Sequence, residues 1–208
     1  MNPDALARQR GRPVSRETYD RLAAFVALLQ KWNPRINLVS ATTLSEAWQR
    51  HILDSIQVFD IADVTEGHWA DLGTGGGFPG LVVAILAAEE APDLAITLVE
   101  SDQRKAAFLA TALRETGARA KIRAERIEAL APLGADILSA RALAPLDRLL
   151  EHAERHLNPN GRALFPKGQN ADAELAQALA SRRFRYEKHP SRTDSQAVIL
   201  QIEDIARG

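Results

Sequence analysis

The sequence contains no cysteine among its 208 residues, and this absence excludes several classes of protein. Without thiols there is no disulfide framework, no thiolate zinc site and no cysteine nucleophile. His152 and His156 are four residues apart, but the residues between them do not complete an H-E-x-x-H motif, and no third ligand is evident. We therefore expect no bound metal, and we expect these two histidines to lie at the surface.

Long apolar runs are also absent. The longest uninterrupted run, residues 81–88, is far shorter than the roughly 20 residues that cross a bilayer. The N-terminus lacks the apolar segment of a signal peptide. Because 46% of the residues are apolar, the chain can still bury a sizeable core. The sequence predicts a cytoplasmic protein that does not enter a membrane, and we expect a monomer.

A strong charge of one sign is missing too, since the net charge is only -1. No global field therefore attracts nucleic acid. Basic residues nevertheless cluster at residues 8–16, 114–126 and 182–189. The last cluster mixes charge with aromatic rings, which is typical of RNA-contacting surfaces. A solvated, arginine-rich face explains each cluster equally well.

Helical spacing dominates the first third of the chain. Ser15 can cap a helix that Asn33-Pro34 ends, and the apolar residues of 45–61 again follow one helical face. These patterns predict an N-terminal helical cap over residues 1–66. The remaining residues, 67–208, are then expected to form a single core.

Strands and helices alternate within that core. The predicted strands are 69–72, 94–99, 121–124, 136–139 and 163–165, and the predicted helices are 78–88, 104–115, 146–157 and 172–181. Such alternation builds a parallel sheet with helices on both faces. Two closing strands, 184–188 and 197–202, have only a turn between them and should be antiparallel to each other. The sequence predicts an α/β, Rossmann-like fold with a seven-stranded, mostly parallel sheet.

A glycine-rich turn, residues 71–80, connects the first strand to the first helix of this core. Its glycines let the backbone bend sharply and approach a ligand, while the helix start presents unpaired N–H groups. Pro79 suits the first helical position. This combination predicts a nucleotide-cofactor site. A turn without a ligand is disfavoured, because consecutive glycines cost backbone entropy without packing against anything.

The acids that flank the turn distinguish between two kinds of cofactor. A dinucleotide fold places a ribose-binding acid about 20 residues on, but only Asp93 lies there, before the second strand begins. Glu100 instead ends that strand, and Asp71 opens the turn. This pairing is typical of class I methyltransferases, in which the second acid binds the ribose hydroxyls of S-adenosylmethionine. A nicotinamide-dependent oxidoreductase is the less favoured alternative.

Several short motifs accompany the glycine turn. They are Trp32-Asn33, Ile36-Asn37-Leu38, His51-Ile52-Leu53-Asp54-Ser55, Lys105, Phe108-Leu109, Arg126-Ile127-Glu128, Arg141-Ala142 and Lys167-Gly168-Gln169. As a set, over about residues 15–202, they resemble the ribosomal RNA small subunit methyltransferase G family, also called glucose-inhibited division protein B. The resemblance implies methyl transfer from S-adenosylmethionine to N7 of a guanine in the 530 loop of 16S rRNA. It also implies 16S rRNA or the small ribosomal subunit as the partner.

The related fold suggests which residues contact the cofactor. The candidates are Asp71, Gly73, Gly75, Phe78, Glu100, Ile127, Glu128 and Arg141. In this interpretation the glycines approach the methionine part, Phe78 covers it, and Glu100 accepts hydrogen bonds from the ribose. Ile127 and Glu128 contact the adenine. Arg141 faces the cofactor or the substrate, unless it simply pairs with an acid such as Glu151 or Asp147.

The candidates near the substrate base are His51, Asp54 and Lys167. Guanine N7 carries an in-plane lone pair, so that we expect neither a general base nor a catalytic triad. A carboxylate such as Asp54 can favour the positive charge that develops on the purine. As alternatives, His51 and Asp54 form with Ser55 a local network that orders the cap, and Lys167 is a surface lysine.

An RNA substrate must present N7 outside a double helix, because A-form RNA encloses it in a deep, narrow groove. A base splayed out of a loop can stack on Trp32 or Trp48, although packing within the cap explains these tryptophans equally well. A non-catalytic RNA-binding or ribosome-assembly module on the same scaffold is the remaining alternative.

Overall fold

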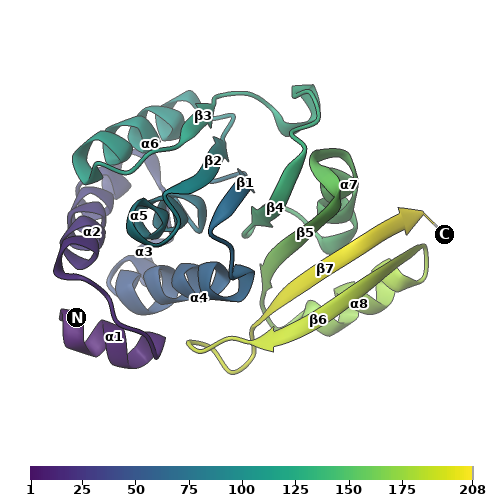
Figure 1. Cartoon of the computed structure of the whole chain (residues 1–208), viewed down its shortest axis with the longest axis horizontal. Helices are drawn as coiled ribbons and strands as arrows, with labels where there is room; N and C mark the ends of the chain where they lie inside the picture. Colours follow the sequence, from purple (N-terminus) through teal and green to yellow (C-terminus); the bar gives the residue numbers. More distant parts are fainter. Residues whose placement is uncertain (208) are drawn as a thin grey trace.

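The structure is a computed structural model that describes residues 1–207, and a seven-stranded sheet runs through its centre (Figure 1). The strands are β1 (Glu66–Leu72), β2 (Asp93–Val99), β3 (Lys121–Arg123), β4 (Ala135–Ala140), β5 (Leu157–Lys167), β6 (Arg182–Pro190) and β7 (Val198–Arg207). Their order in the sheet is β3-β2-β1-β4-β5-β7-β6. Strands β1 to β5 pair in parallel, whereas β7 is antiparallel to both of its neighbours. The predicted α/β, Rossmann-like fold is confirmed.

Helices cover both faces of this sheet. They are α1 (Pro3–Arg10), α2 (Arg16–Ile36), α3 (Ala41–Leu44), η1 (Trp48–Ile52), α4 (Leu53–Ala62), α5 (Gly80–Glu90), α6 (Gln103–Thr116), η2 (Ile127–Ala129), α7 (Leu146–His156) and α8 (Ala171–Leu179). Figure 1 shows α2 beside α6 and the long β6–β7 hairpin at the opposite end of the molecule.

Two apolar cores follow from the alternation of side chains along the strands. Ile137 and Leu164 face one core, and their chain neighbours Leu138 and Phe165 face the other. The first core also contains apolar residues of α2, α4, α5 and α6, while the second is closed by α7 and α8. The N-terminal helices therefore pack directly on the helices of the sheet.

The prediction that Asn33-Pro34 ends the first long helix is wrong, because α2 continues through Pro34 to Ile36. Proline in the last turn removes only one intrahelical hydrogen bond. The buried Asn33 side chain compensates by accepting hydrogen bonds at 2.8 Å from the backbone N–H groups of Leu38 and Val39. Asn37, at φ 47°, then ends the helix in the left-handed conformation.

The helix predicted over residues 45–61 is present as η1 and α4, which follow each other without a break, but its first turn is π-helical. The chain forms α3, then the π-helical turn η1, then α4. His51 lies in the wider turn of η1, and its Nε2 is 2.9 Å from Thr43 Oγ1 in α3. Apolar periodicity detects the buried face, but it does not register one extra residue in a turn.

Arginines in all three basic clusters pair with acids, including Arg114 with Glu115 and Arg123 with Glu125. Arg10 is 2% exposed and bonds Asp60 and Glu90, while Arg182 and Arg185 of β6 pair with acids of α7 and β7. These contacts favour a structural role for the arginines concerned. Within residues 1–207, no helix is long and apolar enough to span a bilayer.

Candidate functional site

The turn between β1 and α5 needs glycine at three positions. Gly73, Gly75 and Gly77 have φ of 65°, 55° and 97°, in the region that side chains disfavour. The N–H of Thr74 donates to the carbonyl of Val99 at the end of β2, at 3.0 Å. The turn is therefore fixed against the neighbouring strand rather than looping freely above the sheet.

Asp71 is fully buried beneath this turn. Its Oδ1 accepts from Ser139 Oγ at 2.6 Å, and its Oδ2 accepts from the backbone N–H of Gly80 at 3.1 Å. Burial raises the pKa of Asp71 to about 6 against these hydrogen bonds, which lower it. The carboxyl group thus ties β1 to β4 and to the start of α5. Pro79, predicted as the first helical residue, precedes the helix as its N-cap.

Glu100 stands at the end of β2 and is 8% exposed. Its Oε2 accepts from the N–H of Gly75 at 2.9 Å, and its Oε1 accepts from the N–H of Asp102 at 2.7 Å. A carboxylate has about four acceptor positions, so that Glu100 retains acceptor capacity towards a ligand.

A cavity of about 420 Å³ opens beside the turn, and we call it the glycine cavity. Five of the eight predicted cofactor residues line it: Gly73, Gly75, Glu100, Ile127 and Glu128. The other three, Asp71, Phe78 and Arg141, do not. It lies at the carboxyl ends of the parallel strands, where ligands bind in open α/β sheets.

Sequence reasoning missed other residues of the glycine cavity. Ser101, Arg148 and His152 also line it. The prediction that His152 and His156 lie at the surface is wrong, because they are 8% and 0% exposed. Burial lowers the pKa of both. Four-residue spacing places them on one face of α7, and it is the buried face of a strongly amphipathic helix.

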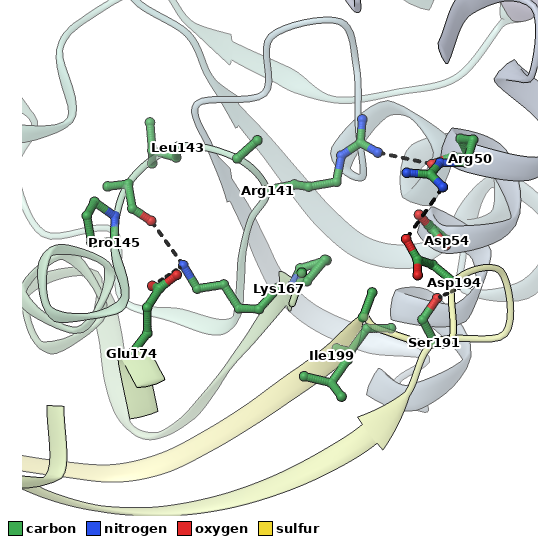
Figure 2. Close-up of a pocket in the computed structure, with 16 residues that line it drawn as sticks. Arg50, Asp54, Arg141, Leu143, Pro145, Lys167, Glu174, Ser191, Asp194 and Ile199 are labelled. Carbon is green, nitrogen blue, oxygen red and sulfur yellow. Dashed lines mark hydrogen bonds and ion pairs between the residues drawn. The ribbon is translucent and has the colours of Figure 1, made fainter. Parts of the chain in front are cut away.

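A second cavity, of about 520 Å³, adjoins the first (Figure 2). We call it the arginine cavity because Arg50 and Arg141 line it. Two candidates for contact with the substrate base, Asp54 and Lys167, line it as well. The third, His51, does not line it but contacts Arg141, which does.

Arg141, His51 and Phe78 form a compact stack between the cap and the sheet. The Arg141 guanidinium lies 4.9 Å from the centre of the Phe78 ring, and the His51 ring stacks on Phe78 at 4.9 Å. Arg141 Nη1 is 2.8 Å from His51 Nδ1. Arg141 therefore contacts the cap, and no ion pair joins it to Glu151 or Asp147 among the described residues.

The charge state of His51 follows from these contacts. Burial, and then the charges of Arg141 and Arg50, lower its pKa to about 3. The ring is therefore neutral near pH 7. Because arginine can only donate, Nδ1 accepts from Arg141, and the proton on Nε2 is directed to Thr43 Oγ1.

Lys167 is also held in place. Its side chain is 10% exposed, and its Nζ lies 2.7 Å from Glu174 Oε2 and donates to the carbonyl of Ala144 at 3.1 Å. The expectation of a surface lysine is thus replaced by a lysine that anchors the segment after β4. Glu174 also accepts from the N–H of Leu146, at 2.7 Å.

That segment, residues 142–144, separates the two cavities and lines both, and we call it the septum. Ala142 has φ 53°, which is unusual for a residue other than glycine. Leu143 lies against the glycine turn, since a Cβ on Gly73 would approach its Cδ1 to 2.6 Å. The two cavities therefore share one wall, the septum.

Solved structures with a similar fold include methyltransferases. A TehB-like S-adenosylmethionine-dependent methyltransferase from Corynebacterium glutamicum aligns with a TM-score of 0.59 at 15% identity, covering 86% of this chain and 98% of that one. A predicted O-methyltransferase from Agrobacterium tumefaciens aligns with a TM-score of 0.57 at 21% identity, covering 74% and 81%. The chain has the class I S-adenosylmethionine-dependent methyltransferase fold.

The sequence identifies the family within that class. Residues 18–200 match the family described as rRNA small subunit methyltransferase G. Proteins named ribosomal RNA small subunit methyltransferase G are 56% identical in Ruegeria pomeroyi, over 93% of this chain and 95% of that one, and 45% identical in Paramagnetospirillum magneticum, over 100% and 98%. The chain belongs to this family, and its cofactor is S-adenosylmethionine. The acceptor capacity of Glu100 beside an open glycine turn suits a ribose with two hydroxyl groups.

Proposed function

We propose that this protein transfers a methyl group from S-adenosylmethionine to N7 of a guanine in the 530 loop of 16S rRNA. Membership of the family supports ribosomal RNA as the substrate. The observation that carries the proposal is the pair of cavities that meet at the septum. One cavity has the features of a cofactor site, and the other offers charged groups to a substrate base.

In this proposal the glycine cavity binds the cofactor. Gly73 and Gly75 admit its methionine part, and Glu100 accepts from its ribose hydroxyls. Ile127 and Glu128 contact its adenine. When bound, S-adenosylmethionine supplies a methyl group on a positively charged sulfur.

The remaining three candidates act from outside that cavity. Asp71 acts indirectly, because its carboxyl group holds the turn and the start of α5. Phe78 and Arg141 support the boundary between the cavities from the side of the cap.

The arginine cavity needs no general base for this reaction. Guanine N7 can attack with its own lone pair, without first losing a proton. His51, neutral and engaged on both ring nitrogens, positions Arg141 rather than moving a proton. The protein then has to align guanine N7 with the methyl carbon and sulfur of the cofactor. Such orientation lowers the activation barrier by about 7 to 11 kcal/mol in well-oriented systems.

The substrate should be a base splayed out of a loop, for the reason that a paired guanine hides N7. Small subunits from cells that lack this gene provide the test. The purified protein and labelled S-adenosylmethionine should produce N7-methylguanine at one position of the 530 loop. Methylation at another atom or in another RNA would contradict the proposal.

Glu100→Gln supplies the matched variant, because it keeps the size of the side chain and weakens its acceptors. We expect cofactor affinity, measured by calorimetry, to fall about tenfold or more, as for loss of a hydrogen bond to a charged group. Folding should persist by circular dichroism. If the wild-type protein binds the RNA but gives no heat with S-adenosylmethionine, it is a non-catalytic RNA-binding module instead.

A further inference from the structure

The charged side chains that line the arginine cavity differ in the partners that they have within the protein. Arg50 pairs with Asp194 at 3.4 Å, Lys167 pairs with Glu174 at 2.7 Å, and Arg141 is held by its neighbours in the cap. Asp54 is different. No ion pair within 4 Å joins it to any residue of 1–207, although three basic side chains line the same cavity.

One contact nevertheless fixes the Asp54 side chain. Thr193, in the connection between β6 and β7, donates its hydroxyl proton to Asp54 Oδ1. No other hydrogen bond to this carboxyl group occurs within the described part of the chain. Burial raises the pKa of Asp54, against the Thr193 hydrogen bond and the charges of Arg141 and Arg50, which lower it. The cavity thus contains a partly buried, oriented carboxyl group with unused acceptors.

The position of Asp54 suits the far side of a bound base. Figure 2 shows Asp54, Arg50 and Asp194 across the cavity from Leu143 and Pro145. If N7 points to the septum, where the cofactor cavity begins, the opposite edge of the guanine points away from it. That edge carries two neighbouring donors, N1–H and the exocyclic amine.

We propose that Asp54 is the residue that selects guanine, its carboxylate accepting hydrogen bonds from N1–H and from the exocyclic amine of the splayed base. Adenine has a lone pair at N1 and would face the carboxylate with an acceptor, and uracil lacks the amine. Thr193 is a positioning residue that holds one carboxylate oxygen. This inference rests on the proposed function, because it takes guanine N7 as the methyl acceptor.

Inosine at the target position tests the contact directly. Inosine keeps N7, the 6-oxygen and N1–H, and lacks only the exocyclic amine. With small subunits reconstituted from 16S rRNA carrying either base, the wild-type protein should prefer guanine by about tenfold to a hundredfold in kcat/KM. Asp54→Asn turns a donor towards the two donors of the base, so that this preference should fall to nearly one.

Asp172→Asn is the matched control, since the side chain of Asp172, on α8, is 81% exposed and pairs with Lys188. It should retain the wild-type preference. Asp54→Ala provides a second variant if Asp54→Asn does not fold, and cofactor affinity should be unchanged in either. Two results would overturn the role of Asp54 alone. One is a guanine preference that stays undiminished in both Asp54 variants, and the other is a wild-type protein with equal kcat/KM for guanine and inosine. No transfer to guanine N7 by the wild-type protein would overturn the proposed function as well.

Discussion

The protonation of His51 links the candidate site to the stability of the protein. Its pKa is about 3 in the folded state and near 6.5 in an unfolded chain. The unfolded state therefore binds the extra proton first, and folding loses stability as the pH falls from about 6.5 towards 3. We expect His51→Asn to lose less stability than the wild-type protein over this pH range, because the variant has no such proton to bind. Urea denaturation at several pH values should show a difference of up to about 1.4 kcal/mol per pH unit between the two free energies of unfolding.

The protonation of Asp71 affects stability with the opposite dependence on pH, but it does not affect the comparison of the wild-type protein with His51→Asn. Its folded pKa is raised, so that its contribution is present at low pH and is lost as the pH rises through about 4 to 6. Because Asp71 is present in both proteins, its effect cancels in the difference. Parallel stability curves for the wild-type protein and His51→Asn would show that folding does not lower the pKa of His51.

For single residues, the sequence predicts the place of a side chain in the fold better than it predicts which other side chains it contacts. The sequence predicts where Asp71 and Glu100 lie, because a strand, a glycine turn and a helix follow each other locally. The sequence does not reveal that Arg141 contacts His51, which lies 90 positions earlier, or that Thr193 holds Asp54. Such contacts depend on how the cap and the β6–β7 connection close over the sheet, and no local spacing encodes that closure.

Among the elements, the start of α5 leaves no room for a side chain at Gly80. A Cβ on Gly80 would lie 2.6 Å from Asp71 Oδ2 and 2.6 Å from Leu98 Cδ2, both in the buried sheet. Gly80→Ala should therefore lower the free energy of unfolding by about 1 to 3 kcal/mol, the usual cost of overpacking. Gly168→Ala is the control, because its Cβ would meet no atom within 4 Å. Equal midpoints in urea for the two variants would contradict this account.

The elements of the core were predictable because apolar runs, some periodic and some continuous, alternate with glycine-rich or polar turns along the chain. The cap was less predictable, and the reasons are specific. Asn33 supports a helix end beyond a proline, and η1 inserts a wider turn before α4. In both places a buried polar side chain, Asn33 or His51, makes hydrogen bonds that apolar periodicity does not encode. Of the two cavities, the glycine cavity follows from local motifs, whereas the arginine cavity is assembled from segments distant in sequence.

At the scale of the whole molecule, one buried arginine connects parts that are far apart in the chain. The Arg10 side chain, at the end of α1, is 0% exposed and bonds Asp60 of α4 and Glu90 of α5. Arg192, beside the arginine cavity, donates to the backbone carbonyl of Arg10 at 2.9 Å. The first helix is thereby joined to the cap, the core and the β6–β7 connection.

Replacing Arg10 should therefore affect the entire fold. Arg10→Leu removes the buried partner that Asp60 and Glu90 share and leaves them the longer contacts of the half-exposed Arg12, at 3.4 and 3.6 Å. Removal of one member of a buried ion pair typically costs about 3 to 5 kcal/mol. Arg16→Leu is the control, because Arg16 is 84% exposed and its pairing with Asp20 contributes little. Urea denaturation should show a large loss for the first variant and a change within about 0.5 kcal/mol for the second. A similarly small change in both would mean that Arg12, at 3.4 Å from Asp60, takes over the pairing, and that the buried arginine does not hold the parts together.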